Sequence, residues 1–498
     1  MKILLLEHPR QTDPGRCNDI ANTPLSSSLI TGYSAAMLVS QGHEVKIVEG
    51  YLEKLAYEEI EQKIAAFQPD LLGIHLVYNW ENNVKLYTFL QKIQKQGLVD
   101  TIVAYGYYPT FAYKEILHHC PAIAAVILGE PEITFAQLAA QPFTNDNFKN
   151  IPGLAWQDEE GAFHGQRREV IADLNQLPFP LRTKAMLNIG EVNLEGSRGC
   201  YGGCTFCYIN PYYGCTKWRG RSPENIAAEI DEVIAKYQKK DFYFTDPNFF
   251  GPGQQGQERA LVLAELLKAR KIHFGIEARA NDIREETIGA LVDAGLRHIL
   301  IGLESGKDAS LKRLNKMTTV AQNENALRIL RHHGIEPNVG FIMFEPDSSV
   351  EDLRLNFSFL QRNSLLNNLA ITANVLYHPQ IILQGTKAYQ ALQEAGRLQL
   401  RATTYEGMTS FLHPQIANFA QAMSQITNYL FVQMDPIWSG RRQSPENAGS
   451  RYSQINNLLV ASFEKILQDL EAGKELTDDK VAVLVNDAQS RIAALLED

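Results

Sequence analysis

The stretch Arg198-Gly199-Cys200-Tyr201-Gly202-Gly203-Cys204-Thr205-Phe206-Cys207 places three cysteines within eight residues, at intervals of four and three. Its glycines leave the backbone flexible enough to bring the thiols together. A closed iron–sulfur cubane normally takes four cysteine ligands. Three ligands leave one iron with an open coordination position, which a reacting molecule needs. The stretch therefore predicts a [4Fe–4S] cluster held by Cys200, Cys204 and Cys207.

The alternative for these cysteines is a structural zinc site with Cys215 as the fourth ligand. Zinc sites usually combine a CxxC pair with a second CxxC or a histidine pair. Here there is one CxxC, and no histidine lies between residues 165 and 272. Cys215 by itself is typical of a small, half-buried apolar side chain, and Cys17 and Cys120 are isolated. The spacing favours the cluster and leaves zinc as the alternative.

Downstream of about residue 190, short strand-like runs alternate with amphipathic helical segments. The clearest helix follows Ser222, which can cap it, and Pro223, which suits its first turn. The expected strands are Val192–Gly196, Phe242–Thr245, His273–Ala278, His298–Leu303, Asn338–Phe344 and Ile371–Leu376. Six such units predict a partial (β/α)6 TIM-like barrel over residues 189–400, with its chemistry at the carboxyl ends of the strands. Residues 401–498 keep a helical period and predict a C-terminal helical region.

Upstream, residues 1–145 show the same alternation in shorter units. The expected strands are Lys2–Glu7, Val45–Val48, Leu71–Leu76, Thr101–Tyr105 and Ala125–Leu128. The expected helices are Ser28–Gln41, Tyr57–Phe67, Asn83–Gln96 and Phe111–His119. This order predicts an α/β domain with a doubly wound, flavodoxin-like sheet, which binds ligands beyond the carboxyl ends of its strands. Residues 146–188 contain Pro152, Pro178 and Pro180 and are expected to be a connector with a small hairpin.

Composition limits the function further. The 498 residues include 47 basic and 57 acidic side chains, so the net charge is −10. This excess of acid argues against a surface that binds nucleic acid or anionic lipid. No apolar run approaches the ~20 residues that cross a bilayer, and the apolar run within MKILLLEHP is too short for a signal-peptide core. We therefore expect a cytoplasmic protein without disulfides.

The CxxxCxxC spacing, with an aromatic residue before the last cysteine, resembles the radical S-adenosylmethionine (SAM) superfamily. In that superfamily the open iron chelates the amino and carboxylate groups of SAM, and the reduced cluster splits SAM into methionine and a 5′-deoxyadenosyl radical. The resemblance places Phe206 beside the adenine and implies further SAM contacts at Thr245, Asp246, Glu277, Arg279 and Glu304. A glutamate can accept hydrogen bonds from ribose hydroxyls, and an arginine can pair with a carboxylate. Salt bridges along the barrel rim are the alternative role for these residues.

A doubly wound domain ahead of such a barrel resembles the cobalamin-binding class of radical SAM enzymes. Three glycine-containing loops carry this resemblance, at residues 42–45, 106–110 and 129–135. It implies cobalamin contacts at Gly106, Tyr107, Pro109, Gly129 and Glu130. The sequence lacks the DxHxxG loop that gives many cobalamin proteins a lower axial histidine, and His75 is expected to be a core histidine. Trp80 is expected to cover that face of the cobalt, with ordinary aromatic packing as the equal alternative.

Two such cofactors imply a reaction at unactivated carbon, which offers no lone pair to attack a sulfonium methyl group. The 5′-deoxyadenosyl radical removes hydrogen from such a carbon, and methylcobalamin delivers the methyl group, while the protein positions both. The resemblance thus implies a cobalamin-dependent radical SAM C-methyltransferase with no catalytic residue beyond the cluster ligands. A cobalamin-dependent radical SAM cyclase or rearrangement enzyme without methyl transfer is the alternative of the same class. A non-enzymatic cobalamin or iron–sulfur sensor is the alternative of another class.

Such an enzyme implies a small-molecule or peptide substrate and an external electron donor such as flavodoxin or ferredoxin. The barrel interior offers Tyr243, Asn338, Asn374 and Tyr377 to a substrate. The nearby basic residues Lys217, Arg219 and Arg221 are expected to form a solvated face.

Overall fold

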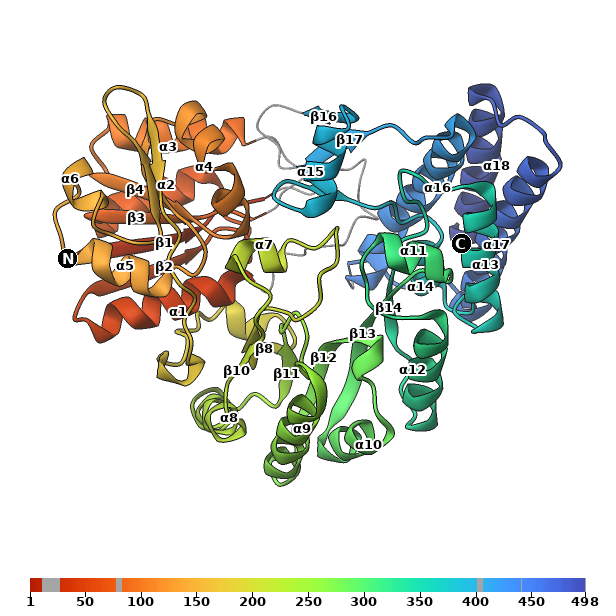
Figure 1. The fold of residues 1–498 in the computed structure, drawn as a ribbon, viewed down its shortest axis with the longest axis horizontal. Helices are drawn as coiled ribbons and strands as arrows, with labels where there is room; N and C mark the ends of the chain where they lie inside the picture. The colour runs from red at the N-terminus through yellow and green to blue at the C-terminus, as the bar shows by residue number, and fades with distance from the viewer. Residues whose placement is uncertain (11–26, 78–82, 401–405, 440, 498) are drawn as a thin grey trace.

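The computed structural model describes residues 1–10, 27–77, 83–400, 406–439 and 441–497 (Figure 1). The N-terminal sheet, drawn in red and orange, lies on one side of the barrel, and the C-terminal helices, in blue, lie on the other. No described helix combines the length and apolar character needed to cross a lipid bilayer.

The N-terminal sheet has the strand order β2-β1-β3-β4-β5-β6-β7, and its first five strands are parallel. These five are β1 (Lys2–Glu7), β2 (Glu44–Glu49), β3 (Leu71–His75), β4 (Thr101–Tyr105) and β5 (Ile123–Ile127). The covering helices are α1 (Ser27–Ser40), α2 (Tyr57–Phe67), α3 (Val84–Lys95), α4 (Tyr107–His119) and α5 (Glu132–Ala139). Apolar side chains of α1 and α5 pack on one face, and those of α2, α3 and α4 pack on the other. The predicted flavodoxin-like order is confirmed.

The hairpin expected in the connector extends this sheet. After the short helix α6 (Asn145–Phe148), strands β6 (Leu154–Gln157) and β7 (Phe163–Gly165) pair antiparallel. Strand β6 also pairs antiparallel with β5. Ala155 and Trp156 of β6 are buried, and each belongs to the apolar cluster on a different face of the sheet. The connector therefore begins as part of the first sheet rather than as a separate segment.

The second parallel sheet has five strands in the order β14-β13-β12-β11-β8. They are β8 (Val192–Leu194), β11 (Asp241–Phe244), β12 (His273–Arg279), β13 (Leu296–Glu304) and β14 (Asn338–Phe341). The helices between and after them are α8 (Pro223–Tyr237), α9 (Gly253–Lys268), α10 (Glu285–Ala294), α12 (Val320–His332) and α13 (Val350–Arg362). As predicted, α8 is capped by Ser222, whose side chain accepts a hydrogen bond from the backbone N–H of Asn225. The result is the expected partial barrel.

The strand expected at Ile371–Leu376 is wrong, because this segment forms helix α14 (Leu369–Val375). The side chain of Asn368 caps it by accepting hydrogen bonds from Ala370 and Ile371. A short apolar run cannot distinguish a buried strand from a buried helix by periodicity alone. In the place expected for a sixth strand, a single bridge joins Phe344 to Pro379.

From Pro414 the chain is helical as predicted, in α16 (Pro414–Trp438), α17 (Ala448–Glu471) and α18 (Asp478–Leu496). The start of the predicted helical region instead contains a strand, Glu406–Thr409. Phe419 and Phe463 bring α16 and α17 against Phe344 of the barrel. The sequence did not predict a small sheet, of order β15-β17-β16, that stands beside helix α15 (Lys387–Glu394) (Figure 1). Its strands are β15 (Ile382–Leu383), β16 (Leu398–Leu400) and β17 (Glu406–Thr409).

Candidate functional site

Residues at the carboxyl ends of both parallel sheets line one cavity of about 720 Å³. From the N-terminal unit, α1 contributes Ile30 and the start of α4 contributes Tyr107. From the barrel, the ends of β11, β12 and β13 contribute Thr245, Arg279 and Glu304. Both architectures bind ligands beyond the carboxyl ends of their strands. This shared cavity is therefore the candidate site.

The cysteine loop, residues 199–208, runs from β9 (Ser197–Arg198) to α7 (Ile209–Tyr213) along the wall of the cavity. All three predicted ligands and Phe206 line the cavity. The Cys200 Sγ accepts a hydrogen bond from the Gly202 N–H at 3.3 Å, and the Cys204 Sγ accepts one from the Arg279 Nη1 at 3.5 Å. A side chain at position 202 would displace the Arg279 guanidinium, so glycine leaves this group room to lie beside Cys204.

The three thiols lie within electrostatic reach of one another. Burial, with a smaller contribution from the neighbouring Cys204 and Cys200, raises the pKa of Cys207 to about 12. Burial also raises the pKa of Cys200, while the charges of Arg279 and Lys316 lower it. Metal binding requires the thiolate form, and these two cations favour that form. The donor set fits an iron–sulfur cluster that carries negative charge.

Among the described residues, no three His, Cys, Asp or Glu side chains converge closely enough to hold a single metal ion. Thiols that bind three different irons of a cubane need not meet at one point. Cys215 is half-buried, packs in the apolar cluster of Ile209 and Tyr213, and does not line the cavity.

A buried ion pair lies beside the cysteine loop. Glu304, the last residue of β13, has a φ of 63°, and its Oε1 lies 2.7 Å from the Lys316 Nζ. Burial disfavours the charge on Lys316, but Glu304 and Cys204 together hold its pKa above the ordinary value. Arg279 donates a hydrogen bond to the Lys316 carbonyl oxygen. The cysteine end of the cavity therefore concentrates its cations, Arg279 and Lys316, around the three thiols.

The barrel floor carries acidic groups instead. Glu277 precedes Arg279 by two residues on β12, so their side chains leave the same face of the strand about 7 Å apart. The Tyr243 hydroxyl donates to the Glu277 Oε1 at 3.0 Å, and Glu277 forms no ion pair with a described residue. Burial raises the pKa of Glu277 to about 7. Tyr243 stacks on His298, whose Nε2 lies 2.6 Å from the Glu191 Oε1.

Two further carboxyls lie near the cysteine loop. Glu195 lines the cavity, and burial raises its pKa to about 7 although the Arg198 Nε donates to it at 2.8 Å. Asp246 does not line the cavity. Its carboxylate accepts hydrogen bonds from the Gly196 N–H and the Ser197 hydroxyl, each at 2.7 Å. The structure thus brings Phe206, Thr245, Glu277, Arg279 and Glu304 together at the cavity. It places Asp246 behind them, where it holds the strand that leads into the cysteine loop.

Of the described residues predicted to contact cobalamin, Tyr107 lines the cavity, and Gly106, Pro109, Gly129 and Glu130 lie outside its lining. Its ring contacts Tyr208 and Tyr212 edge-on, with centroids 4.9 and 4.5 Å apart. Gly106 precedes it with a φ of 118°, and a Cβ there would lie 2.5 Å from the Leu76 carbonyl oxygen. Pro109 is buried in the first turn of α4. The loop after β4 therefore packs directly against the segment that follows the cysteines.

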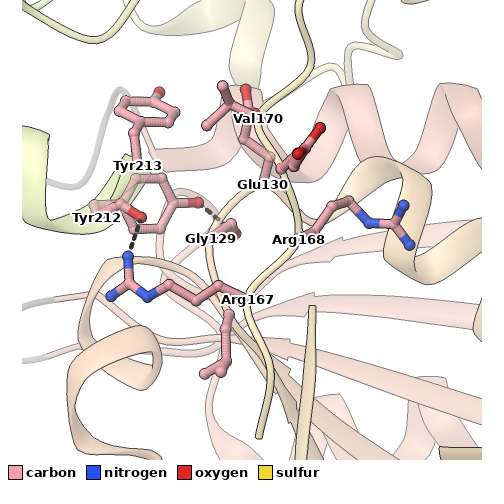
Figure 2. Close-up of a pocket in the computed structure, with 9 residues that line it drawn as sticks. Gly129, Glu130, Arg167, Arg168, Val170, Tyr212 and Tyr213 are labelled. Carbon is pink, nitrogen blue, oxygen red and sulfur yellow. Dashed lines mark hydrogen bonds between the residues drawn. The ribbon is translucent and has the colours of Figure 1, made fainter. Parts of the chain in front are cut away.

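Gly129 and Glu130 lie at the contact between the two units (Figure 2). The Gly129 carbonyl accepts a hydrogen bond from the Tyr212 hydroxyl at 2.7 Å. The buried Glu130 carboxylate accepts from Arg198 at 3.0 Å and from Arg219 at 2.9 Å. Arg198 also binds Glu132 at 2.7 Å. These residues tie the loop after β5 to the strand that leads into the cysteine loop.

The solvated face expected at Lys217, Arg219 and Arg221 is wrong for the two arginines, which are buried. Arg219 pairs with Glu130, and Arg221 pairs with Glu229 of α8. Glu130 lies 89 residues before Arg219, so the local cluster of basic residues gave no indication of that pair. Glu229 lies eight residues after Arg221, on the next helix. Lys217 is exposed, as expected.

Other predicted residues have mixed positions. Trp80 lies outside the described residues. His75 is a buried core histidine, as expected, and its Nδ1 lies 2.7 Å from the Glu7 Oε1. Of the proposed barrel-interior residues, Tyr243 and Asn374 line the cavity. Asn338 is exposed.

Sequence reasoning missed several lining residues, above all Lys316, Glu191, Glu195 and His298. Glu195 and His298 fall in or beside expected strands, and alternation along those strands was the available signal. Lys316 lies in a turn without a recognisable motif, and no pattern in the sequence identifies it.

Two family models match the chain. The model of the radical SAM superfamily matches residues 194–360, and the model of the B12 binding domain matches residues 31–139. The chain therefore contains a B12-binding domain followed by a radical SAM domain. These are the two domains expected from the cysteine stretch and the sheet ahead of it. Their cofactors are a [4Fe–4S] cluster, SAM and cobalamin.

Proteins of known sequence match this chain at low identity. An uncharacterized methyltransferase of Pyrococcus horikoshii is 25% identical over 372 residues, which cover 73% of this chain and 78% of the relative. An anaerobic magnesium-protoporphyrin IX monomethyl ester cyclase of Synechocystis sp. is 27% identical over 349 residues, covering 67% of each chain.

A solved structure supports the fold along nearly the whole chain. The structure of the cobalamin-dependent S-adenosylmethionine radical enzyme OxsB, with aqua-cobalamin and S-adenosylmethionine bound, superposes with a TM-score of 0.79 at 21% identity. The match covers 99% of this chain and 79% of that chain. The arrangement of the B12-binding and radical SAM domains with the C-terminal helices is thus a known fold.

Proposed function

We propose that this protein is a cobalamin-dependent radical SAM enzyme that methylates an unactivated carbon of a small molecule or peptide. One observation carries the proposal: Tyr107 of the B12-binding domain and the three cysteines of the radical SAM domain line the same cavity. A substrate in that cavity can therefore meet both cofactors. Of the two relatives, the Pyrococcus methyltransferase matches 73% of this chain and the Synechocystis cyclase matches 67%.

When bound, the cluster and SAM supply a 5′-deoxyadenosyl radical, and cobalamin supplies a methyl group. Cys200, Cys204 and Cys207 hold the cluster in this proposal. Arg279 and Lys316 place positive charge beside those thiolates, and Phe206 offers an aromatic face for the adenine. No acid or base among the side chains is needed, so residues here bind, orient and exclude water.

The other predicted contacts keep their proposed roles within this scheme. Thr245 and Glu304 are proposed to bind SAM from the barrel edge, next to Arg279. Gly106, Tyr107 and Pro109 are proposed to approach the corrin, since they begin α4 beside the cavity. Gly129 and Glu130 fix the loop after β5, and Trp80 is proposed to cover the lower cobalt face. Residues 1–145, 189–400 and 401–498 are the proposed cobalamin-binding, radical SAM and helical units, joined by 146–188.

The test is a product analysis that needs no substrate. Protein reconstituted anaerobically with iron, sulfide and hydroxocobalamin is incubated with SAM and titanium(III) citrate. We expect both 5′-deoxyadenosine and S-adenosylhomocysteine, because SAM serves as radical source and as methyl donor. 5′-Deoxyadenosine without S-adenosylhomocysteine contradicts methyl transfer and favours the cyclase alternative, which the Synechocystis relative also suggests. If neither 5′-deoxyadenosine nor S-adenosylhomocysteine forms, the radical SAM assignment is wrong.

A further inference from the structure

The cysteine loop contacts two segments from later in the chain, the turn after α11 and the start of α15. The Thr205 N–H donates to the Leu314 carbonyl at 2.9 Å, and the Asn315 side chain donates to the Gly203 carbonyl at 2.7 Å. On the other side of Thr205, its carbonyl accepts from the Ala388 N–H at 2.9 Å, at the start of α15. Asn315 is itself exposed to solvent. The distance from the protein surface to the cysteines is therefore short here.

The turn at residues 314–317, after α11 (Asp308–Arg313), connects this surface to the cavity. Lys316 points inward and forms the buried pair with Glu304. Its neighbours Asn315 and Met317 are exposed, and both adopt the left-handed conformation, with φ of 49° and 58°. Successive residues of one turn thus contact the cysteine loop, the interior of the site and the solvent.

Met317 suits neither its backbone conformation nor its surroundings. A positive φ is disfavoured for a residue other than glycine or asparagine, because the Cβ then crowds the following carbonyl oxygen. Its side chain is 64% exposed, which leaves most of a large apolar group in water. Folding of this chain alone favours a glycine or a polar residue at such a position. An apolar contact with another molecule accounts for a methionine.

The charges on α11 and α15, whose neighbouring residues contact the cysteine loop, indicate what that molecule is. Lys312 on α11 and Lys387 at the start of α15 are exposed, and neither forms an ion pair with a described residue. Arg313 differs, because Glu345 binds it at 3.0 Å. The chain as a whole carries a net charge of −10. What distinguishes these two exposed lysines is their place on α11 and α15, which carry the turn and the helix start that contact the cysteine loop.

We propose that Lys312, Asn315, Met317 and Lys387, here called the donor face, form the docking surface of an acidic one-electron carrier protein. This inference rests on the proposed function, since a radical SAM cluster must be reduced before it cleaves SAM. One electron leaves the reduced carrier, which is oxidised by one electron, and reduces the cluster from the 2+ to the 1+ state. No covalent bond forms or breaks. The two lysines steer the acidic carrier, and Met317 supplies the apolar centre of the contact.

The experiment compares two reductants on the reconstituted full-length protein. Reduced flavodoxin, an acidic flavin carrier, requires docking, whereas dithionite does not. The variant Lys312→Glu/Lys387→Glu reverses the charge of the donor face. The control Lys240→Glu/Lys271→Glu changes two exposed lysines that precede β11 and β12, at the opposite end of the barrel. Cluster reduction is followed by stopped-flow absorbance and by electron paramagnetic resonance, without substrate.

We expect the double variant to lower the second-order rate constant for reduction by flavodoxin by about tenfold or more at low salt, because charge steering acts on association. The difference should shrink at high salt, where screening is strong. Dithionite should reduce both variants and the wild type equally, and the control should match the wild type. A rate with flavodoxin within twofold of wild type, or an equal loss in the control, would overturn the proposal. So would a change of oligomeric state in the variant, which would assign this face to a second copy of the chain.

A smaller variant separates the apolar contact from the charges. Met317→Ser keeps both lysines and should weaken flavodoxin binding, measured by isothermal titration, about threefold to tenfold. Unchanged binding would remove Met317 from the contact. The proposed function fails separately, if the dithionite-reduced wild type does not cleave SAM. The donor face fails if that cleavage is intact while flavodoxin reduces the charge-reversed variant normally.

Discussion

The two ends of the cavity are built from the same strands but carry opposite charge. At the cysteine end, Arg279 and Lys316 lie beside the three thiols. At the barrel floor, Glu277 accepts a hydrogen bond from Tyr243 and forms no ion pair with any residue that the structure describes. Alternation along β12 puts Glu277 and Arg279 on one face, so a single strand supplies both environments. The cysteine end therefore suits anionic groups, and the floor suits neutral or cationic ones.

The largest expected effect is at the cysteine end. Cys204→Ser removes a proposed cluster ligand. Since losing even a residue behind a metal ligand typically costs about 10–100-fold, we expect SAM cleavage to fall by more than about 100-fold. Iron content and 5′-deoxyadenosine formation measure this. Cys215→Ser is the matched control, because Cys215 does not line the cavity, and it should keep both. If the Cys204→Ser protein keeps both its iron and its SAM cleavage, Cys204 is not a cluster ligand, and the cysteine end of the cavity does not hold the cluster as proposed.

A moderate effect is expected for the buried cation of the same end. Lys316→Met removes the partner of Glu304 and a charge next to Cys204, so SAM should bind about 10–100-fold more weakly. Equilibrium dialysis of SAM against the reconstituted protein measures this. Lys312→Met, on the exposed helix just before it, is the control and should bind SAM normally. Adding Glu304→Gln to Lys316→Met should recover thermal stability, since no buried charge is then unpaired. Normal SAM affinity in Lys316→Met would contradict the role of this cation.

The smallest effect concerns the floor and its dependence on pH. Burial raises the pKa of Glu277 from 4.5 to about 7, so the folded protein holds a proton there that the unfolded chain releases over this range. This group therefore stabilises the fold less as the pH rises from about 4.5 to about 7. We expect the stability of the wild type relative to Glu277→Gln to fall by about 2 kcal/mol between these pH values. Thermal unfolding midpoints at several pH values measure the difference.

Two comparisons sharpen this last prediction. Tyr243→Phe removes the hydrogen bond that lowers the pKa of Glu277, so the loss of stability should extend to higher pH. Glu191→Gln changes a half-exposed pair with His298 and should alter the profile little, because exposed ion pairs contribute about 0–1 kcal/mol. Parallel pH profiles for the wild type and Glu277→Gln would mean that the floor does not hold a proton.

Much of the site was open to prediction from short sequence patterns. The spacing of Cys200, Cys204 and Cys207 is local. Arg279 and Glu304 were indicated by their places at the ends of expected strands together with the resemblance to the radical SAM superfamily. The position of Lys316 at the site could not be predicted, because it depends on a turn that folds back onto the end of β13. Helix α14 was misassigned because an apolar run of that length fits a buried strand equally well.

The sequence by itself determined the order of the two domains, the spacing of the three cysteines and most strand positions, because these follow from spacing and periodicity within a few residues of one another. The tertiary structure decided that Glu130 and Arg219 are buried partners and that Lys316 faces the thiols while Met317 faces solvent. It also decided that Glu277 lies without an ion pair among the described residues. Such pairings join residues far apart in the chain. The energy of such a pair depends on whether the two charges are buried together, and the order of residues in the sequence does not show which charges are buried together.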